Sequence, residues 1–153
     1  MSRPFRFPSH RLRELIEAKK CLRETEIKWR TEGRGGRSTR LPLDLVDGPF
    51  VDFVLSVAAG DLKDPTTYRA ALILAGERVR GVDFSEIARS RFYRPYIVRG
   101  WHQNVIDPNL PSSHRNRNRH IPLDNFDATD LDDFFRKLCQ LRHIDLEFEQ
   151  KLL

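Results

Sequence analysis

Two stretches of the chain repeat apolar residues at three- and four-residue spacing, which is the pattern of a helix with one buried face. The first is residues 10–24, preceded by Ser9, whose hydroxyl can cap a helix start. The second runs from Thr129 to His143, where Thr129 with Asp132 resembles a capping box. The apolar positions are Leu12, Leu15, Ile16 and Leu22 in the first stretch, and Leu131, Phe134, Phe135, Leu138 and Leu141 in the second. We predict a helix in each.

Alternating apolar and polar residues predict strands in much of the remaining chain. Ile27 and Trp29 precede a connection rich in Gly and Arg at residues 31–37, and alternating leucines follow it, which is the signature of a hairpin. Further strands are predicted at residues 51–59, 67–76, 79–84 and 144–148. For residues 51–59 a short helix is the alternative, because Phe50 and Val54 add a second apolar side.

The region after residue 90 gives a weaker pattern. Residues 91–99 have the aromatic and β-branched composition of a strand, but Pro95 cannot donate a ladder hydrogen bond, which predicts a position at a sheet edge. Residues 100–123 lack a sustained period and are rich in Asn, Pro, Ser and Arg. A connection this long in a compact domain is usually functional or mobile, and we expect a functional loop.

Together these elements predict an α+β fold, with an antiparallel sheet covered on one face by the N-terminal and the C-terminal helix. The alternative, a parallel βαβ arrangement, needs helices between the strands, and the pattern offers none. The chain has 153 residues, which is the size of one domain, so we expect a single domain over residues 1–153.

Composition bears on bound metals, on disulfides and on the expected location of the protein. Cys21 and Cys139 are the only cysteines and lie far apart, which favours neither a disulfide framework nor a metal site, and we expect no cofactor and no bound metal. The first ten residues lack an apolar signal segment, and no later run is long enough for a membrane span. We therefore expect a cytoplasmic protein that does not enter the membrane.

Charge points to the kind of partner. The formal net charge is +5 and the pI is about 9.6. Residues 89–120 concentrate this charge, because they hold seven arginines and three histidines with Asp107 as the only acid. Such a field favours a polyanion, so we predict a nucleic acid as partner, RNA rather than DNA. An acidic protein, such as an antitoxin, would fit the same charge.

The histidines in this region have the chemistry of a metal-independent ribonuclease, which needs a base for the 2'-hydroxyl, an acid for the leaving oxygen and cations for the charged transition state. The candidate catalytic residues are His102, His114, His120 and Arg115. The same histidines can also be ordinary surface residues. If they converge on one point an enzyme is favoured, and if they diverge a binding protein is favoured.

Candidate nucleic-acid contacts are arginines that can reach phosphates and side chains that can hold a base. They are Arg34, Arg37, Arg99, Arg117, Arg119, Trp101, Asn104 and Tyr96. The glycines beside Arg34 and Arg37 would let the backbone come close to a phosphate chain, although an exposed turn has the same composition. Aromatic residues in such strands also commonly pack into a core.

Two short motifs resemble nuclease families. Arg115-Asn116 followed by His120 resembles the Arg-Asn-x-x-x-His motif of the HEPN ribonuclease superfamily, which implies RNA cleavage in a helical, dimeric protein. The segment from His120 to Leu123, followed by Cys139 and His143, resembles the frame of HNH endonucleases. That resemblance implies His120 as general base and His143 as a metal ligand.

The C-terminal half as a whole has an arginine-flanked strand, the sequence WHQN, a polar loop and an amphipathic helix with Phe and Cys. This order resembles a family of small uncharacterised bacterial proteins that are often found with mobile elements. The resemblance implies a bacterial or phage setting, and a toxin or defence role rather than metabolism. Two hypotheses stay open: a small RNase-like enzyme, and a non-catalytic binding or interaction module of a phage or plasmid.

Overall fold

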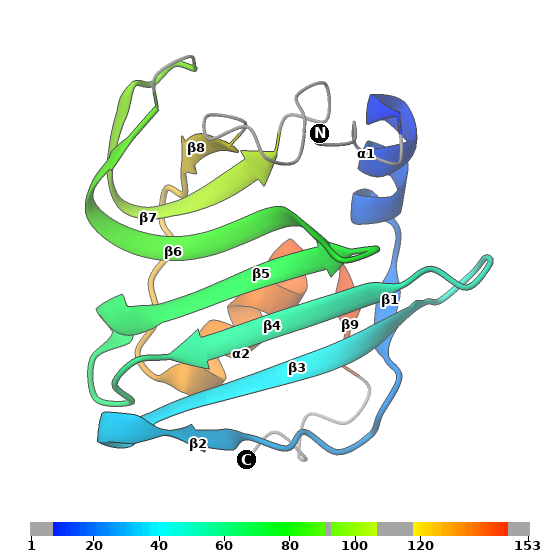
Figure 1. Ribbon diagram of the computed structural model, residues 1–153, viewed down its shortest axis with the longest axis horizontal. Coiled ribbons are helices and arrows are strands. Elements are labelled where there is room, and N and C mark those ends of the chain that lie inside the picture. The colour runs from blue at the N-terminus through cyan, green and yellow to red at the C-terminus, as the bar shows by residue number, and fades with distance from the viewer. Residues whose placement is uncertain (1–7, 91–92, 107–117, 147–153) are drawn as a thin grey trace.

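The computed structural model describes residues 8–90, 93–106 and 118–146, and this part of the chain is mostly β-structure (Figure 1). Strands account for 48% and helices for 20% of it. The predicted α+β fold, with two helices covering one face of an antiparallel sheet, is therefore wrong. The sheet is larger than predicted, it curls into a half-barrel, and it is mixed rather than antiparallel.

Nine strands form one sheet in the order β8-β7-β6-β5-β4-β3-β1-β9, with β2 paired to β3. They are β1 (Lys20–Leu22), β2 (Arg30–Glu32), β3 (Gly36–Leu45), β4 (Phe53–Ala59), β5 (Tyr68–Leu74), β6 (Glu77–Arg89), β7 (Ile97–Ile106), β8 (Asn118–Pro122) and β9 (Ile144–Asp145). Every pairing is antiparallel except that of β1 with β9, which is parallel. Consecutive strands from β3 to β8 are neighbours, as hairpin connections require.

The curl has local causes along β6. The register between β5 and β6 shifts at Leu72 and Ile73, and that between β6 and β7 shifts between Ser85 and Ala88. Such bulges bend a strand and increase its right-handed twist. Gly100, opposite Ser85, has a φ of 85°, which residues with a Cβ rarely adopt. The end of the sheet formed by β6, β7 and β8 consequently bends away from the rest (Figure 1).

Two α-helices are described, α1 (Ser9–Glu17) and α2 (Leu131–Leu141), together with the short 3-10 helices η1 (Gly33–Gly35) and η2 (Pro65–Thr67). Helix α2 lies across one face of the sheet, behind it in Figure 1, whereas α1 stands at one end beside the turn between β5 and β6. We call the face that α2 covers the helix face, and the opposite one the open face.

Both predicted helices exist, but their boundaries differ from the prediction. Helix α1 ends at Glu17 because the next residues pair as β1, where Leu22 lies opposite Leu43 of β3. Tertiary pairing here overrides a helical pattern. The cap of α2 is Asp130 rather than Thr129, and its carboxylate accepts a hydrogen bond from the backbone of Asp133 at 2.8 Å.

The core lies between the helix face and α2. Alternate residues of β4 and β5 point into it, and Leu55, Leu74 and Phe134 are each 0% exposed. Helix α1 adds Leu12, Leu15 and Ile16 to the same core. Phe135 and Leu138 of α2 are almost fully buried, as the predicted apolar stripe requires.

Two buried cations tie the helices to the sheet. The Nζ of Lys20, which is 0% exposed, donates to the carbonyls of Ile16, Ala18 and Arg142 at 2.5, 2.8 and 3.1 Å. It thereby satisfies carbonyls at the end of both helices. The guanidinium of Arg142 donates to the side chain of Gln103 and to the carbonyl of Gly81, so it supports β6 and β7 from the helix face.

The predictions for residues 91–123 need the largest correction. Pro95 lies in the connection between β6 and β7, and β7 is an inner strand rather than the predicted edge strand. The predicted loop 100–123 begins inside β7 and ends one residue after β8, so its described residues except Leu123 are strand residues. Residues 107–117 lie outside the described part of the chain.

Candidate functional site

A polar cluster lies on the open face where β6, β7 and β8 run side by side. Successive residues of a strand point to opposite faces, so His102 and Asn104 of β7 point to the open face while Trp101 and Gln103 point to the helix face. In the register of the sheet, Asp83 of β6 lies opposite His102, and His120 of β8 lies opposite Asn104. We call these four residues, Asp83, His102, Asn104 and His120, the polar cluster.

Hydrogen bonds join the four side chains in one chain. His102 Nε2 donates to Asp83 Oδ1 at 2.7 Å, and Asn104 Nδ2 donates to the same oxygen at 3.3 Å. This fixes the orientation of the Asn104 amide, whose oxygen accepts from Nδ1 of His120 at 2.5 Å. The rings of His102 and His120 meet edge to face, with centroids 5.2 Å apart.

The environment gives the two histidines opposite properties. Burial lowers the pKa of His102, but its hydrogen bonds to Asp83 and to the carbonyl of Gly100 outweigh burial and raise the pKa above its ordinary value. Burial and the neighbouring charge of His102 lower the pKa of His120, against smaller opposing effects of Asp83 and the carbonyl of Arg89. At neutral pH, His120 is therefore the neutral member of the pair.

The carboxyl of Asp83 stays ionised. Burial raises its pKa, but the hydrogen bonds from His102 and Asn104 and the charge of His102 outweigh this and hold the pKa below its ordinary value. His102 is 1% exposed and has an acceptor at each ring nitrogen, so a ligand cannot reach its protons unless the pair with Asp83 breaks. In this arrangement His102 positions Asp83, while the partly exposed His120 can face a ligand.

A groove of about 150 Å³ runs along the open face beside the polar cluster. Its floor consists of small residues, Ser56, Ala58, Ala71 and Gly81. The arginines Arg69 and Arg78 also line it, and neither forms an ion pair with any residue that the structure describes. We call this depression the open-face groove. Asp83 and Asn104 line it as well, so the cluster and the groove form one site.

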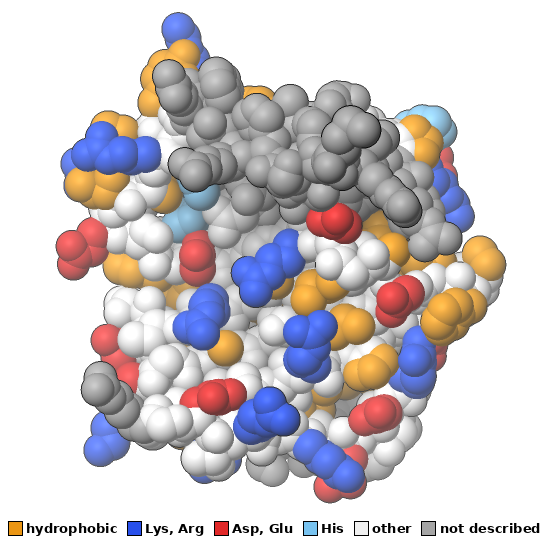
Figure 2. Space-filling view, in the orientation of Figure 1, with side chains coloured by type: hydrophobic (Ala, Val, Ile, Leu, Met, Phe, Trp, Pro, Cys, Tyr) orange, Lys and Arg blue, Asp and Glu red, His pale blue; other side chains and the backbone are white. Residues whose placement is uncertain are grey.

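The register explains how the site is assembled. One row of directly paired residues crosses six strands on the open face: Arg40, Ser56, Ala71, Gly81, Asn104 and His120. A Cβ at Gly81 would come within 3.1 Å of Asn104 Nδ2, so glycine leaves the space that the Asn104 amide occupies. Figure 2, which looks onto this face, shows Lys and Arg side chains spread over the middle of the sheet and histidine atoms beside the grey, undescribed residues.

The structure brings together some of the residues predicted from the sequence. His102, His120 and Asn104 meet in the polar cluster. His114, Arg115 and Arg117 lie outside the described residues, as does the side chain of Arg34.

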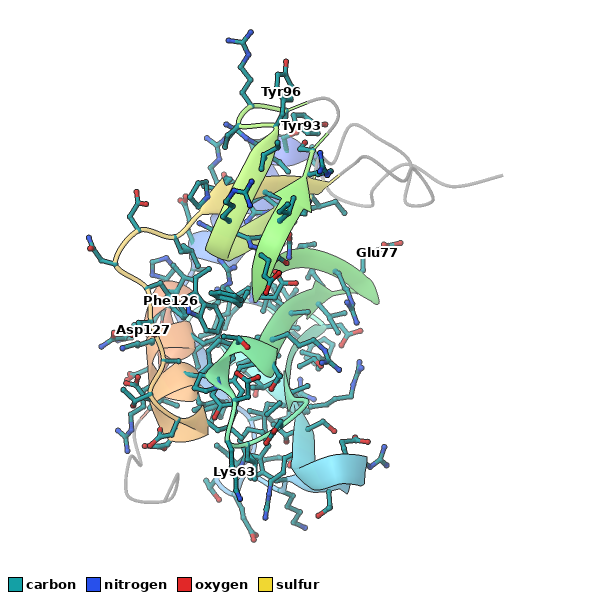
Figure 3. The ribbon with its side chains drawn as sticks, turned by 90° about the vertical axis from the view of Figure 1, so that its left-hand side faces the viewer. Lys63, Glu77, Tyr93, Tyr96, Phe126 and Asp127 are labelled. Atoms are coloured by element: carbon teal, nitrogen blue, oxygen red, sulfur yellow. The ribbon has the colours of Figure 1, made fainter. Side chains whose placement is uncertain are left out.

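Trp101 lies on the helix face. Its ring packs edge to face against Phe84 and Phe126, at centroid distances of 5.6 and 5.2 Å, and also contacts Phe134. Figure 3 shows Phe126 between the sheet and α2. Trp101 therefore belongs to the core and is not placed to hold a base beside the histidines.

Three further predicted contacts lie near the far end of β6 and β7. Tyr96 is 51% exposed at the tip of this hairpin, where Figure 3 also shows Tyr93, and the guanidinium of Arg94 lies 5.8 Å from the ring of Tyr96. Arg119 donates to the carbonyl of Arg94, and Arg99 donates to that of Glu86. These residues form a basic and aromatic tip, and none of them lines the open-face groove.

Arg37 lies on the helix face, beside Trp29 and Phe135, and not in the open-face groove. Sequence reasoning missed Asp83, Arg69 and Arg78. One signal for Asp83 was available, because Gly81 and Asp83 share the two-residue spacing of His102 and Asn104, which is the spacing of neighbours on one face of a strand. That signal is readable only if residues 100–106 are assigned to a strand.

Among the described residues, no group of three or more His, Cys, Asp or Glu side chains could hold a metal ion. His143, the metal ligand that the HNH resemblance implies, directly follows α2, whereas His120 points to the open face. Within the described part of the chain, no helix has the length and apolar character needed to cross a membrane.

Comparison with known proteins gives no relative for this chain. No family model matches it, and neither the curated proteins nor the solved structures include a significant match. The function has to be inferred from the site alone.

Proposed function

We propose that this protein binds single-stranded nucleic acid, RNA in preference to DNA, along the open-face groove. The observation that carries the proposal is the groove itself, in which Arg69 and Arg78 lie beside small residues and form no ion pair with a described residue. Guanidinium groups that are free of carboxylates favour phosphate, and a small-residue floor lets a sugar-phosphate chain come close to the backbone.

The polar cluster favours a nucleic acid over an acidic protein. A peptide carboxylate can pair with the arginines, but it offers no hydrogen-bond donor to the ionised Asp83 at the edge of the same groove. A nucleotide carries both anionic oxygens for the arginines and hydroxyl or amino donors for a carboxylate. The mixture of Arg69 and Arg78 with Asp83 and Asn104 fits that combination.

The proposal is tested by measuring the affinity for a fluorescent single-stranded oligonucleotide from about 50 to 200 mM salt. The Arg69→Ala/Arg78→Ala variant should bind more weakly and reduce the slope of log K against log salt by about 1.4, since each lost phosphate contact removes about 0.7. The matched control is Arg136→Ala/Lys137→Ala, which removes the same charge from α2, where both side chains pair with aspartates.

If the control changes the slope as much as the groove variant does, binding follows net charge and the open-face groove is not the site. If no oligonucleotide is retained at about 50 mM salt, the proposal fails, and an acidic protein partner becomes the better explanation.

A second function, metal-independent RNA cleavage, is supported by the state of His120. Its pKa is lowered, so the ring is neutral at neutral pH and one of its two nitrogens carries a lone pair, while the oxygen of Asn104 and the carbonyl of Arg89 compete for the single proton. Such a ring can take the proton of a 2'-hydroxyl as general base, while groove arginines neutralise the phosphorane. Cleavage of single-stranded RNA in EDTA would support this function, and cleavage that EDTA abolishes would contradict it.

A further inference from the structure

Among the described residues, both hydrogen-bond donors to Asp83 bind the same one of its two carboxylate oxygens. The donors are His102 Nε2 and Asn104 Nδ2, and the oxygen is Oδ1. No described residue donates to Oδ2, although the side chain is 39% exposed and lines the open-face groove. His102 and Asn104 thus hold the carboxylate in place and leave a single acceptor for a ligand.

The chemistry of this oxygen limits what it can bind. The lowered pKa keeps the carboxyl ionised at neutral pH, so it accepts hydrogen bonds and repels phosphate. Guanine offers two adjacent donors and needs both oxygens of a carboxylate, but Oδ1 already takes two hydrogen bonds. One free acceptor suits one donor, and the donor that every nucleotide of RNA carries and DNA lacks is the ribose 2'-hydroxyl.

The neighbouring strand supplies the rest of a nucleotide site. Arg69 of β5 lies directly opposite Asp83 of β6, and paired strands are about 4.8 Å apart. A phosphate held by Arg69 and a ribose beside Asp83 can therefore belong to one nucleotide. Gly81 lies between Ala71 and Asn104 in the same row, and because it has no side chain the Asn104 amide lies directly over it beside Asp83.

We propose that Asp83 Oδ2 accepts a hydrogen bond from a ribose 2'-hydroxyl and makes the open-face groove selective for RNA. This inference rests on the proposed binding function, but it does not require cleavage. Asp83 would be the residue that determines the class of nucleic acid, and His102 and Asn104 would position it.

The test compares three oligouridines of one length, made of RNA, DNA and 2'-fluoro RNA. The 2'-fluoro group keeps the sugar shape of RNA but has no hydrogen to donate. We expect the wild-type protein to bind RNA about tenfold more tightly than either of the other two, as expected for one hydrogen bond to a charged acceptor. In Asp83→Asn, where an amide group replaces the free oxygen, the ratio of RNA to 2'-fluoro RNA affinity should fall to about one.

The ratio is the readout, because removal of the Asp83 charge raises the affinity for every oligonucleotide. The control variant is Asp132→Asn on α2, which removes the same charge on the helix face and leaves the polar cluster and the open-face groove unchanged, so it should keep the preference for RNA. Thermal unfolding of both variants verifies that each is folded.

Equal binding of RNA and 2'-fluoro RNA by the wild-type protein overturns this inference and leaves the proposed function intact. A preference for RNA that survives in Asp83→Asn also overturns it, since the 2'-hydroxyl is then recognised elsewhere. So does a loss of affinity in Asp83→Asn that appears with oligoadenine or oligocytosine but not with oligouridine, because Oδ2 would then accept from a base amino group. Failure to bind any of the oligonucleotides is a different result, and it removes the proposed function itself.

Discussion

The two faces of strand β7 differ although their residues alternate along one segment of chain. On the helix face, Trp101 packs against three phenylalanines, and Gln103 accepts a hydrogen bond from the buried Arg142. On the open face, His102 and Asn104 bind Asp83 and His120 beside a groove lined with arginine. One face is filled with apolar contacts, and the other keeps polar groups and space.

This difference separates residues that stabilise the fold from residues that serve a site. Burying Trp101 and its neighbours is favourable in proportion to the apolar area removed from water. Placing an ionised Asp83 and a charged His102 in a sheet gains little, because the desolvation of a pair offsets its attraction. Local departures from the best packing are expected where a protein binds or reacts, and the open face has that character.

The largest effect is expected on the helix face. Phe135 is 1% exposed in the core, so Phe135→Ala should lower the free energy of unfolding by about 3–5 kcal/mol, through lost burial and the cavity left behind. The matched control is Phe50→Ala, since Phe50 is 75% exposed and its ring lies 5.3 Å from the guanidinium of Arg23, outside the core. Urea denaturation measures both, and a loss below about 1 kcal/mol for Phe135 would contradict the assigned core.

The second effect concerns the cation inside that core. Burial, with the neighbouring charge of Arg142, lowers the pKa of Lys20 from 10.5 to about 8. Below pH 8 the lysine is protonated in both the folded and the unfolded chain. Between pH 8 and 10.5 only the unfolded chain binds this proton, so the contribution of Lys20 to stability rises with pH, by about 3 kcal/mol.

The measurement is urea denaturation at pH 8 and pH 10, compared with Lys20→Met. In Lys20→Met, the rise in the free energy of unfolding that Lys20 contributes between these two pH values should be missing, whatever the overall stability of the variant. Because loss of three carbonyl contacts can prevent Lys20→Met from folding, NMR of ¹³C-labelled lysine side chains in the wild-type protein is a second readout. If every lysine titrates near 10.5, Lys20 is not buried as a cation.

The third effect returns to the open face. His120→Ala should lower RNA cleavage in EDTA by about 10²-fold and leave RNA affinity nearly unchanged, because a general base acts on the transition state. The rate of RNA cleavage by the wild-type protein should fall as the pH drops through the lowered pKa of His120, since protonation removes the lone pair. His143→Ala, an exposed histidine beyond α2, is the control. Equal cleavage by the wild-type protein and His120→Ala would mean that His120 does not catalyse the cleavage. Nucleic-acid binding would then remain as the proposed function.

How far the sequence predicts these two faces depends on the range of the interactions. The helix face follows from local patterns: the stripe of Phe134, Phe135 and Leu138 and the alternation of residues 53–59 predict which side chains are buried. The extra length assigned to the first helix is a local error, because the pairing of Leu22 with Leu43 is not visible in a helical window.

The open face could not be predicted in the same way, because it depends on register. The row from Arg40 to His120 needs five correct strand pairings, and a shift of one residue in any of them would place part of the row on the other face. In addition, both faces of β7 carry polar residues, so residues 100–106 lack the apolar alternation that identifies a strand. The polar residues that form the candidate site therefore also make strand β7 hard to recognise in the sequence.

The fourth effect is on stability near neutral pH. His102→Gln removes a charge-assisted hydrogen bond to Asp83 and should lower the free energy of unfolding by about 2 kcal/mol. The raised pKa of His102 means that its contribution is complete below pH 6.5 and is lost as the pH rises through the folded-state value. The lowered pKa of Asp83 means that its contribution is present above pH 3.8 and is lost as the pH falls through its folded-state value.

The difference between the wild-type protein and His102→Gln should consequently be largest between about pH 4 and 6.5 and should shrink on either side. Urea denaturation across this range measures it. A difference that is independent of pH would mean that His102 and Asp83 do not interact as an ion pair.

The smallest expected effect tests most directly which of the two faces binds the nucleic acid. Arg37 and Arg40 are exposed arginines of one strand, β3, and lie on opposite faces, with Arg37 beside Phe135 and Arg40 in the row that ends at His120. Each substitution by alanine removes one charge from nearly the same point of the chain. If a nucleic acid lies on the open face, Arg40→Ala should weaken binding a few-fold and reduce the salt slope by about 0.7, while Arg37→Ala changes neither. The reverse result would move the nucleic acid to the helix face and to the hairpin of β2 and β3, and equal effects would indicate attraction by net charge, which has no preferred face.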